Sequence, residues 1–237
     1  MKILLIDTCG ATGSIALAET GAEPTVVTGA TLPGRTASER LVPAIRELSE
    51  ARGIALSSLD AVAVVHGPGS FTGVRVGVSA AKGLCEGLDL PLVEISRLAV
   101  LAHLANVPGG GQVYTLLDAG RGEFYCGIYA DGRCLREAML THAEVLAEFA
   151  VSVESTILDA TNPTPIVVAC EKTVAESVAS LIPRLVAEST AEDALPLALR
   201  RIEQGDFDDV SRIDANYLRR TDLEIFAKQR LAGALKK

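Results

Sequence analysis

Residues 3–18 read ILLIDTCGATGSIALA, and this stretch predicts the architecture of the chain. An apolar run at 3–6 ends in the carboxylate of Asp7, and glycines at positions 10 and 13 permit a tight turn before a second run at 14–18. A third strand is expected near residues 25–31, after a turn at 21–24. The chain is therefore predicted to open with a three-stranded antiparallel meander.

The same order of features returns about 110 residues later, which indicates an internal duplication. An apolar run at 113–117 ends at Asp118, and a glycine turn at 119–122 leads into a strand at 123–130. Asp131 and Gly132 then form a hairpin signal before residues 133–138. We predict an N-terminal lobe at 1–108 and a C-terminal lobe at 109–211, joined at the glycine run 109–111. A C-terminal helix, about residues 212–237, is expected to pack back on the first lobe.

Helical patterns lie between and after the two meanders. Thr36 and Glu39 have the spacing of a capping box, and apolar residues then recur at helical intervals. Pro43 should kink this helix or mark its true start. Strands are expected at 61–65 and 166–169, and helices at 72–88, 98–104, 141–149, 173–186, 191–204 and 223–235. Three strands followed by helix, strand and helix, used twice, predict an α/β fold.

Composition narrows the classes of function. The chain has 237 residues, 49% of them apolar, with a net charge of -8 and a pI near 5.0. This balance argues against a large phosphate-neutralising surface. The first apolar run is too short for a signal peptide, and no segment approaches a membrane span. The five cysteines form no C-x-x-C pair, so a reduced, cytoplasmic setting is expected.

The most distinctive motif is HGPGSFTG, residues 66–73, between a predicted strand and a predicted helix. Glycine loops at this position can hold anions on a helix N-terminus, but the motif lacks the Walker A lysine and misses the dinucleotide spacing by one residue. One alternative is an anion site. The other is a strand-to-helix turn whose glycines let a neighbouring backbone come close.

A stripe of small residues continues into the next helix. Gly73, Gly77 and Ala81 recur every four residues and therefore share one face. Each glycine inside a helix costs about 0.5–1 kcal/mol relative to alanine, so a compensating close contact is expected. That contact could be internal, or it could be with a partner chain.

The sequence GPGSFTGVRVG, residues 67–77, resembles the signature of the bacterial TsaB (YeaZ) family. IDT at 6–8, SERLVP at 38–43 and YLR at 217–219 are also similar to that family. The resemblance implies a two-lobed actin-like ATPase fold of the hexokinase and Hsp70 type. It implies a role in forming N6-threonylcarbamoyladenosine at position 37 of tRNA, beside a catalytic subunit, TsaD, and an ATPase, TsaE. It also implies a homodimer when the partner is absent, no membrane contact, and tRNA contact only through the complex.

The resemblance places the partner interface on the helices of the first lobe. The residues expected there are Ser38, Glu39, Leu41, Ile45, Gly73, Arg75, Val76, Gly77, Ala80 and Ala81. Arg75 would pair with a carboxylate of the partner or with a nucleotide phosphate. The alternative for Arg75 is a solvated surface side chain.

A nucleotide cleft is the other candidate site. In an actin-like fold, Asp7 and Asp118 would face the cleft with Gly69 and Ser70, and would organise Mg2+ and phosphates. In the favoured alternative, each carboxylate accepts backbone N–H groups from its own turn. We expect no cofactor on the isolated chain, with ATP or ADP and Mg2+ reserved for an assembled complex.

No catalytic or metal-binding constellation is evident. The three histidines, His66, His103 and His142, lack the spacing of a helical metal pair, and Ser70 lies outside a nucleophile elbow. The leading hypothesis is a non-catalytic scaffold subunit. The alternative is an ATP-dependent phosphotransferase or carbamoyl-group enzyme acting in its own cleft, and a metallopeptidase is a third, weaker hypothesis. The basic tail, with Lys228, Arg230, Lys236 and Lys237, is either a solvated helix end or a tRNA contact.

Overall fold

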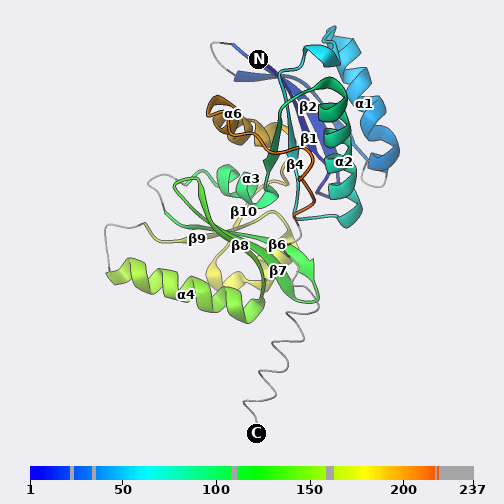
Figure 1. Cartoon of the computed structure of the whole chain (residues 1–237). Helices are drawn as coiled ribbons and strands as arrows, with labels where there is room; N and C mark the ends of the chain where they lie inside the picture. Colours follow the sequence, from blue (N-terminus) through cyan, green and yellow to red (C-terminus); the bar gives the residue numbers. More distant parts are fainter. Residues whose placement is uncertain (22–23, 34–35, 108–110, 159–162, 217, 219–237) are drawn as a thin grey trace.

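The computed structural model describes residues 1–21, 24–33, 36–107, 111–158, 163–216 and 218. Two five-stranded sheets organise these residues, in the orders β3-β2-β1-β4-β5 and β10-β9-β6-β7-β8. Figure 1 shows the two sheets one above the other, each with helices beside it. The predicted two-lobed α/β fold is confirmed.

The first sheet contains the predicted opening meander. β1 (Lys2–Asp7), β2 (Gly13–Thr20) and β3 (Pro24–Leu32) pair antiparallel, with Asp7 opposite Ser14. β4 (Ala61–Val65) then adds parallel to β1, and β5 (Leu92–Ile95) parallel to β4. The short strand β5 was not predicted.

The second sheet repeats this topology. β6 (Val113–Gly120), β7 (Glu123–Ala130) and β8 (Arg133–Thr141) form the antiparallel meander. β9 (Ile166–Ala169) adds parallel to β6, and the two-residue β10 (Arg184–Leu185) parallel to β9. The predicted duplication is therefore confirmed, because both sheets share the same strand order and pairing.

Helices cover both sheets. α1 (Ala37–Arg52) and α2 (Phe71–Leu88) lie together on one side of the first sheet in Figure 1. α3 (Arg97–Leu104) lies between the sheets, where Leu98 and Leu101 pack with Leu117 and Tyr129. α4 (His142–Leu158) covers the opposite side of the second sheet. None of the helices in the described part of the chain is long and apolar enough to cross a membrane.

The helix α6 (Leu195–Glu203) differs from the predicted division of the lobes. It falls within the range assigned to the second lobe, but Ala198, Leu199 and Ile202 pack into the core of the first sheet. An apolar helical face is buried wherever a matching surface is available, and position along the chain does not decide which one. The lobe boundaries themselves stay a prediction, and residues 108–110 lie outside the described part of the chain.

Two local predictions are wrong, and one of the two alternatives for Pro43 is excluded. Thr36 precedes α1, but its hydroxyl donates to the carbonyl of Pro33 and accepts no cap hydrogen bond, so the capping box does not form. Pro43 lies inside α1 and does not mark its start. The helix predicted at 173–186 is only α5 (Lys172–Ser177), because a 3-10 turn, a left-handed Ile182 and then a proline interrupt it. The predicted tail helix at 223–235 lies outside the described residues.

Candidate functional site

The small-residue stripe of α2 faces inward, against the strand β1 and the turn that follows it. A Cβ atom at Gly73 would lie 2.0 Å from the backbone oxygen of Thr8, and one at Gly77 would lie 2.4 Å from the hydroxyl oxygen of Thr8. That hydroxyl donates to the carbonyl oxygen of Gly73 at 2.6 Å, and Ala81 is fully buried. The internal alternative is therefore confirmed for Gly73 and Gly77. The prediction that Gly77 and Ala81 touch a partner chain is wrong for this fold.

Leu41 and Ile45 were also predicted to contact a partner, but their side chains lie in the core. Leu41 and Ile45 on α1 are 1% and 2% exposed and belong to the core of the first sheet. Leu41 still borders the surface groove described next, whereas Ile45 does not line it. The helical spacing that suggested these positions is the same spacing that places a residue in a core, which explains the error for Ile45.

An open groove runs along the outer side of α1 and α2. Its volume is about 560 Å³. Val42 and Phe71 are 55% and 62% exposed, although both are large and apolar. The groove is lined by Ser38, Leu41, Val42, Phe71, Thr72, Arg75, Val76, Ser79 and Ala80. Five predicted interface residues, Ser38, Leu41, Arg75, Val76 and Ala80, thus meet here, and Glu39 is exposed nearby on α1.

Arg75 packs against its neighbour on the rim of this groove. Its guanidinium carbon lies 3.4 Å from the centre of the Phe71 ring, a cation–π arrangement that keeps the charge on the surface. The charged face of Arg75 therefore borders an apolar floor. We call this surface, defined by the nine lining residues, the α1/α2 groove.

A second concave region lies between the two lobes, with a volume of about 570 Å³. The first lobe contributes the β1–β2 turn, Gly69, Ser70 and Arg97, and the second lobe contributes Asp118 and the residues around Glu171. The full lining is Cys9, Gly10, Ala11, Gly69, Ser70, Arg97, Leu117, Asp118, Cys170, Glu171, Thr173 and Glu188. Three of the predicted nucleotide-cleft residues, Gly69, Ser70 and Asp118, are therefore brought together. We call this region the interlobe cleft.

Asp7 is buried and does not line the cleft. Its side chain is 2% exposed and accepts the backbone N–H of Cys9 at 2.8 Å. Burial raises the pKa of Asp7, and the hydrogen bond from Cys9 and the charge of Arg97 oppose that rise. Asp118 likewise accepts the backbone N–H of Gly120 at 2.8 Å. The alternative in which each carboxylate binds its own turn is therefore confirmed.

No cluster of histidine, cysteine, aspartate and glutamate side chains in the described ranges could hold a metal ion. Asp7 and Asp118 hold their own turns, so a Mg2+–nucleotide pair built on them gains no support from the geometry.

Arg97 and Glu188 are cleft residues that the sequence did not reveal. Arg97 is 4% exposed, and its terminal nitrogen lies 3.1 Å from a carboxylate oxygen of Glu188. The same oxygen accepts the backbone N–H of Ala11 at 2.8 Å. The two charged residues are 91 positions apart, so no spacing rule could have paired them.

A polar cluster fastens the lobes together behind the loop 66–70. Glu137 on β8 accepts hydrogen bonds from Ser96, Tyr129 and Asn216, the last at 2.8 Å. His66 lies 3.6 Å from Glu94 in the same region. Burial lowers the pKa of His66, so the ring is neutral near pH 7 and acts as a packed loop residue.

The raised pKa of Glu94 predicts how the stability of the fold depends on pH. Burial, and then the nearby Asp208 carboxylate, raise the pKa of Glu94 to about 7 from an ordinary value of 4.5. Protonation therefore favours the folded state: the stabilisation is complete below about pH 4.5 and is lost as the pH rises through about 7. We expect Glu94→Gln to unfold with the same free energy as the parent near pH 4.5, but to be about 2–3 kcal/mol more stable at pH 8.

Urea unfolding at both pH values measures this difference. A matched control is Glu203→Gln, an exposed glutamate at the end of α6, which should show no such pH-dependent gain. An equal effect of Glu94→Gln at pH 4.5 and pH 8 would contradict the assignment.

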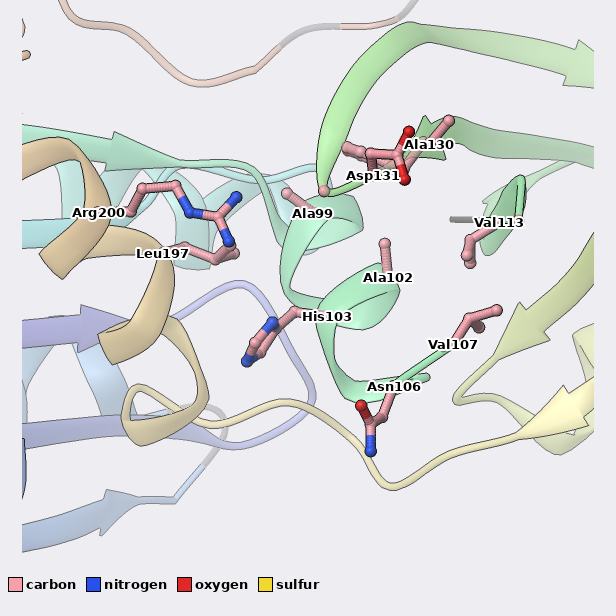
Figure 2. A pocket seen from close by; sticks show the side chains of 13 residues that line it. Ala99, Ala102, His103, Asn106, Val107, Val113, Ala130, Asp131, Leu197 and Arg200 are labelled. Carbon is pink, nitrogen blue, oxygen red and sulfur yellow. The ribbon is translucent and has the colours of Figure 1, made fainter. Parts of the chain in front are cut away.

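A separate hollow of about 290 Å³ is lined by residues of α3, α6 and the β7–β8 turn. Figure 2 shows His103 and Ala102 of α3, Arg200 of α6 and Asp131 of the β7–β8 turn around it. A Cβ atom at Gly132 would lie 2.9 Å from the guanidinium of Arg200, so that turn approaches α6 closely. None of the residues predicted for binding lines this hollow.

Comparison with known protein families identifies the family to which the chain belongs. The family model described as TsaD, tRNA N6-adenosine threonylcarbamoyltransferase, matches residues 31–220. The chain therefore belongs to this family, and within it to the TsaB (YeaZ) group, as the following similarities show.

The chain is 37% identical over 130 residues to the tRNA threonylcarbamoyladenosine biosynthesis protein TsaB of Escherichia coli, covering 54% of this chain and 55% of that protein. It is 37% identical over 147 residues to TsaB of Bacillus subtilis, covering 62% of each. The matched region thus spans about half to three fifths of these curated relatives. YeaZ from Pseudomonas aeruginosa has the same fold, with a TM-score of 0.70 and 28% identity over 92% of this chain and 99% of that chain.

Proposed function

We propose that this chain is a non-catalytic, activating subunit of the machinery that forms N6-threonylcarbamoyladenosine at position 37 of tRNA. In this proposal it binds a TsaD-type catalytic subunit, works with the ATPase TsaE, and meets tRNA only through the complex. It forms a homodimer when the catalytic subunit is absent. The TsaB proteins it resembles are named for biosynthesis of this modified nucleoside, which supports the pathway.

The α1/α2 groove is the observation on which the proposal depends. Val42 and Phe71 expose large apolar side chains beside a groove, and burying such surface is the main favourable term in protein association. Arg75 at the rim adds a charge suited to a carboxylate of a partner. An apolar floor with a charged rim is the usual composition of a protein interface.

The competing hypothesis, an enzyme acting in its own cleft, has less support. Asp7 is buried against its own turn, and the Glu188 carboxylate already accepts the donors that a phosphate would need. We therefore propose that nucleotide and Mg2+ belong to the assembled complex. The metallopeptidase hypothesis has no support from the described residues, because they include no cluster of metal ligands.

The direct test is a modification assay on tRNA with purified TsaD-type and TsaE-type subunits, with and without this chain. We expect modified nucleoside to accumulate only when this chain is present, and we expect the chain to co-purify with the catalytic subunit. Asp7→Asn should leave co-purification intact. Turnover by this chain alone, lost on Asp7→Asn, would favour the enzyme hypothesis instead.

A further inference from the structure

One oxygen atom of Glu188 receives two donors at the wall of the interlobe cleft. The backbone N–H of Ala11 donates to it at 2.8 Å, and a terminal nitrogen of Arg97 donates at 3.1 Å. The donors come from the first lobe, whereas Glu188 lies on the segment that crosses from the second sheet toward α6. The Glu188 carboxylate thus accepts hydrogen bonds from two donors that belong to the first lobe.

These two donors have the character of an anion site. Arg97 is only 4% exposed, and its Nε atom has no hydrogen-bond partner among the described residues. A buried guanidinium and a backbone N–H in a glycine turn are the groups that proteins use for phosphate. The guanidinium therefore has donor capacity that Glu188 alone does not satisfy.

The surrounding glycines keep the backbone close to this position. A Cβ atom at Gly10 would lie 2.2 Å from the bound oxygen of Glu188. One at Gly69 would lie 2.3 Å from the backbone oxygen of Cys9 and 3.2 Å from Arg97. Any other residue at Gly10 would push the carboxylate out. The close approach at Gly10 thus fits an anion against the β1–β2 turn, and in this structure the anion is Glu188.

The Glu188 carboxylate is hydrogen-bonded to Arg97 and Ala11, yet it remains accessible from the cleft. Its side chain is 41% exposed to the cleft, whereas Arg97 beneath it is buried. The neighbouring Ser189 hydroxyl lies 3.5 Å from Asp7, and the backbone N–H of Val186 donates to the carbonyl of Ala169. These contacts hold the segment 186–189 in place at both ends. A tethered group of this kind competes at high effective concentration with any free anion.

We propose that Glu188 is a built-in occupant of an anion site formed by Arg97 and the Ala11 N–H, and that it keeps inorganic polyphosphate out of the interlobe cleft. Removing its charge opens the site to a free anion of this class. The proposal concerns the cleft alone and does not depend on the α1/α2 groove, so partner binding and anion binding are tested separately.

The experiment titrates pyrophosphate into the full chain by calorimetry at low ionic strength. We expect Glu188→Ala to bind pyrophosphate at least about tenfold tighter than the parent chain, because the tethered competitor is gone. Pyrophosphate should also raise the melting temperature of Glu188→Ala and leave that of the parent nearly unchanged. Glu176→Ala is the matched control: it removes one negative charge from an exposed residue of α5 that does not line the cleft, and it should bind no better than the parent.

Glu188→Ala leaves Arg97 without its ion-pair partner and could lower stability, so Glu188→Gln is the second variant. It keeps the shape and an acceptor oxygen, and we expect it also to bind pyrophosphate more tightly than the parent. Adding Arg97→Gln to Glu188→Gln should abolish the gain. The proposal fails if a folded Glu188 variant binds no better than the parent, if the parent binds equally well, or if Glu176→Ala gains as much.

Discussion

Val42→Asp is expected to weaken binding of the catalytic subunit by roughly 30-fold or more, equivalent to about 2 kcal/mol. Val42 lies on the α1/α2 groove and is 55% exposed, so its side chain is available to a partner. In the complex, the new carboxylate would be buried without a compensating partner, which is costly. In the free chain it remains in water, and stability should change by only about 0.5 kcal/mol.

Phe71→Asp provides an independent variant on the facing helix. Phe71 is the first residue of α2, and a carboxylate there is favourable to the positive end of the helix. The substitution also removes the ring against which Arg75 stacks. We expect α2 to remain folded while partner binding and self-association are lost together.

The matched control is Val151→Asp on α4. Val151 is 62% exposed, so this substitution introduces the same chemical change at a similar exposure on the other lobe. Co-purification and analytical ultracentrifugation measure the result, with circular dichroism as the check on folding. If Val42→Asp and Val151→Asp bind the catalytic subunit equally well, the groove is not the interface.

Gly77→Leu is expected to destabilise the first lobe and not merely to disrupt an interface. A Cβ atom at Gly77 already lies within 2.4 Å of the Thr8 hydroxyl and 3.6 Å of Ile6, and leucine adds three more carbon atoms. Neither neighbour can move freely, because Ile6 and Thr8 are 1% and 2% exposed. Overpacking of this kind costs about 1–3 kcal/mol or more, and most of it should appear as lost stability.

Gly83→Ala is the matched comparison on the same helix. No atom lies within 4 Å of the position that its Cβ would take, so alanine meets no clash. Alanine is the better helix former, and we expect a gain of about 0.5–1 kcal/mol. Urea unfolding of both variants measures the difference. A stable Gly77→Leu chain that has lost only its dimer would contradict the internal packing of α2.

The amino-acid sequence by itself determined both meanders and the duplication that relates them. Short apolar runs, the carboxylates Asp7 and Asp118, and the glycine turns are local signals, because strand period and turn geometry depend on neighbouring residues. The motif at 67–77 likewise carried the resemblance to the TsaB (YeaZ) group. The resemblance also placed Ser38, Arg75 and Val76 on one surface, where Ser38 and Arg75 are exposed and Val76 is half-buried.

Only the tertiary structure decided which way each helix faces. Gly77 and Gly83 both lie inside α2, yet a Cβ atom at Gly77 would meet Thr8 and one at Gly83 would meet nothing within 4 Å. Helical spacing gives a shared face but not the surface that the face meets. The pairing of Arg97 with Glu188, across 91 positions, likewise depends on how the chain crosses between the sheets. Such contacts are fixed by packing between distant segments, and a pattern read along one segment does not contain them.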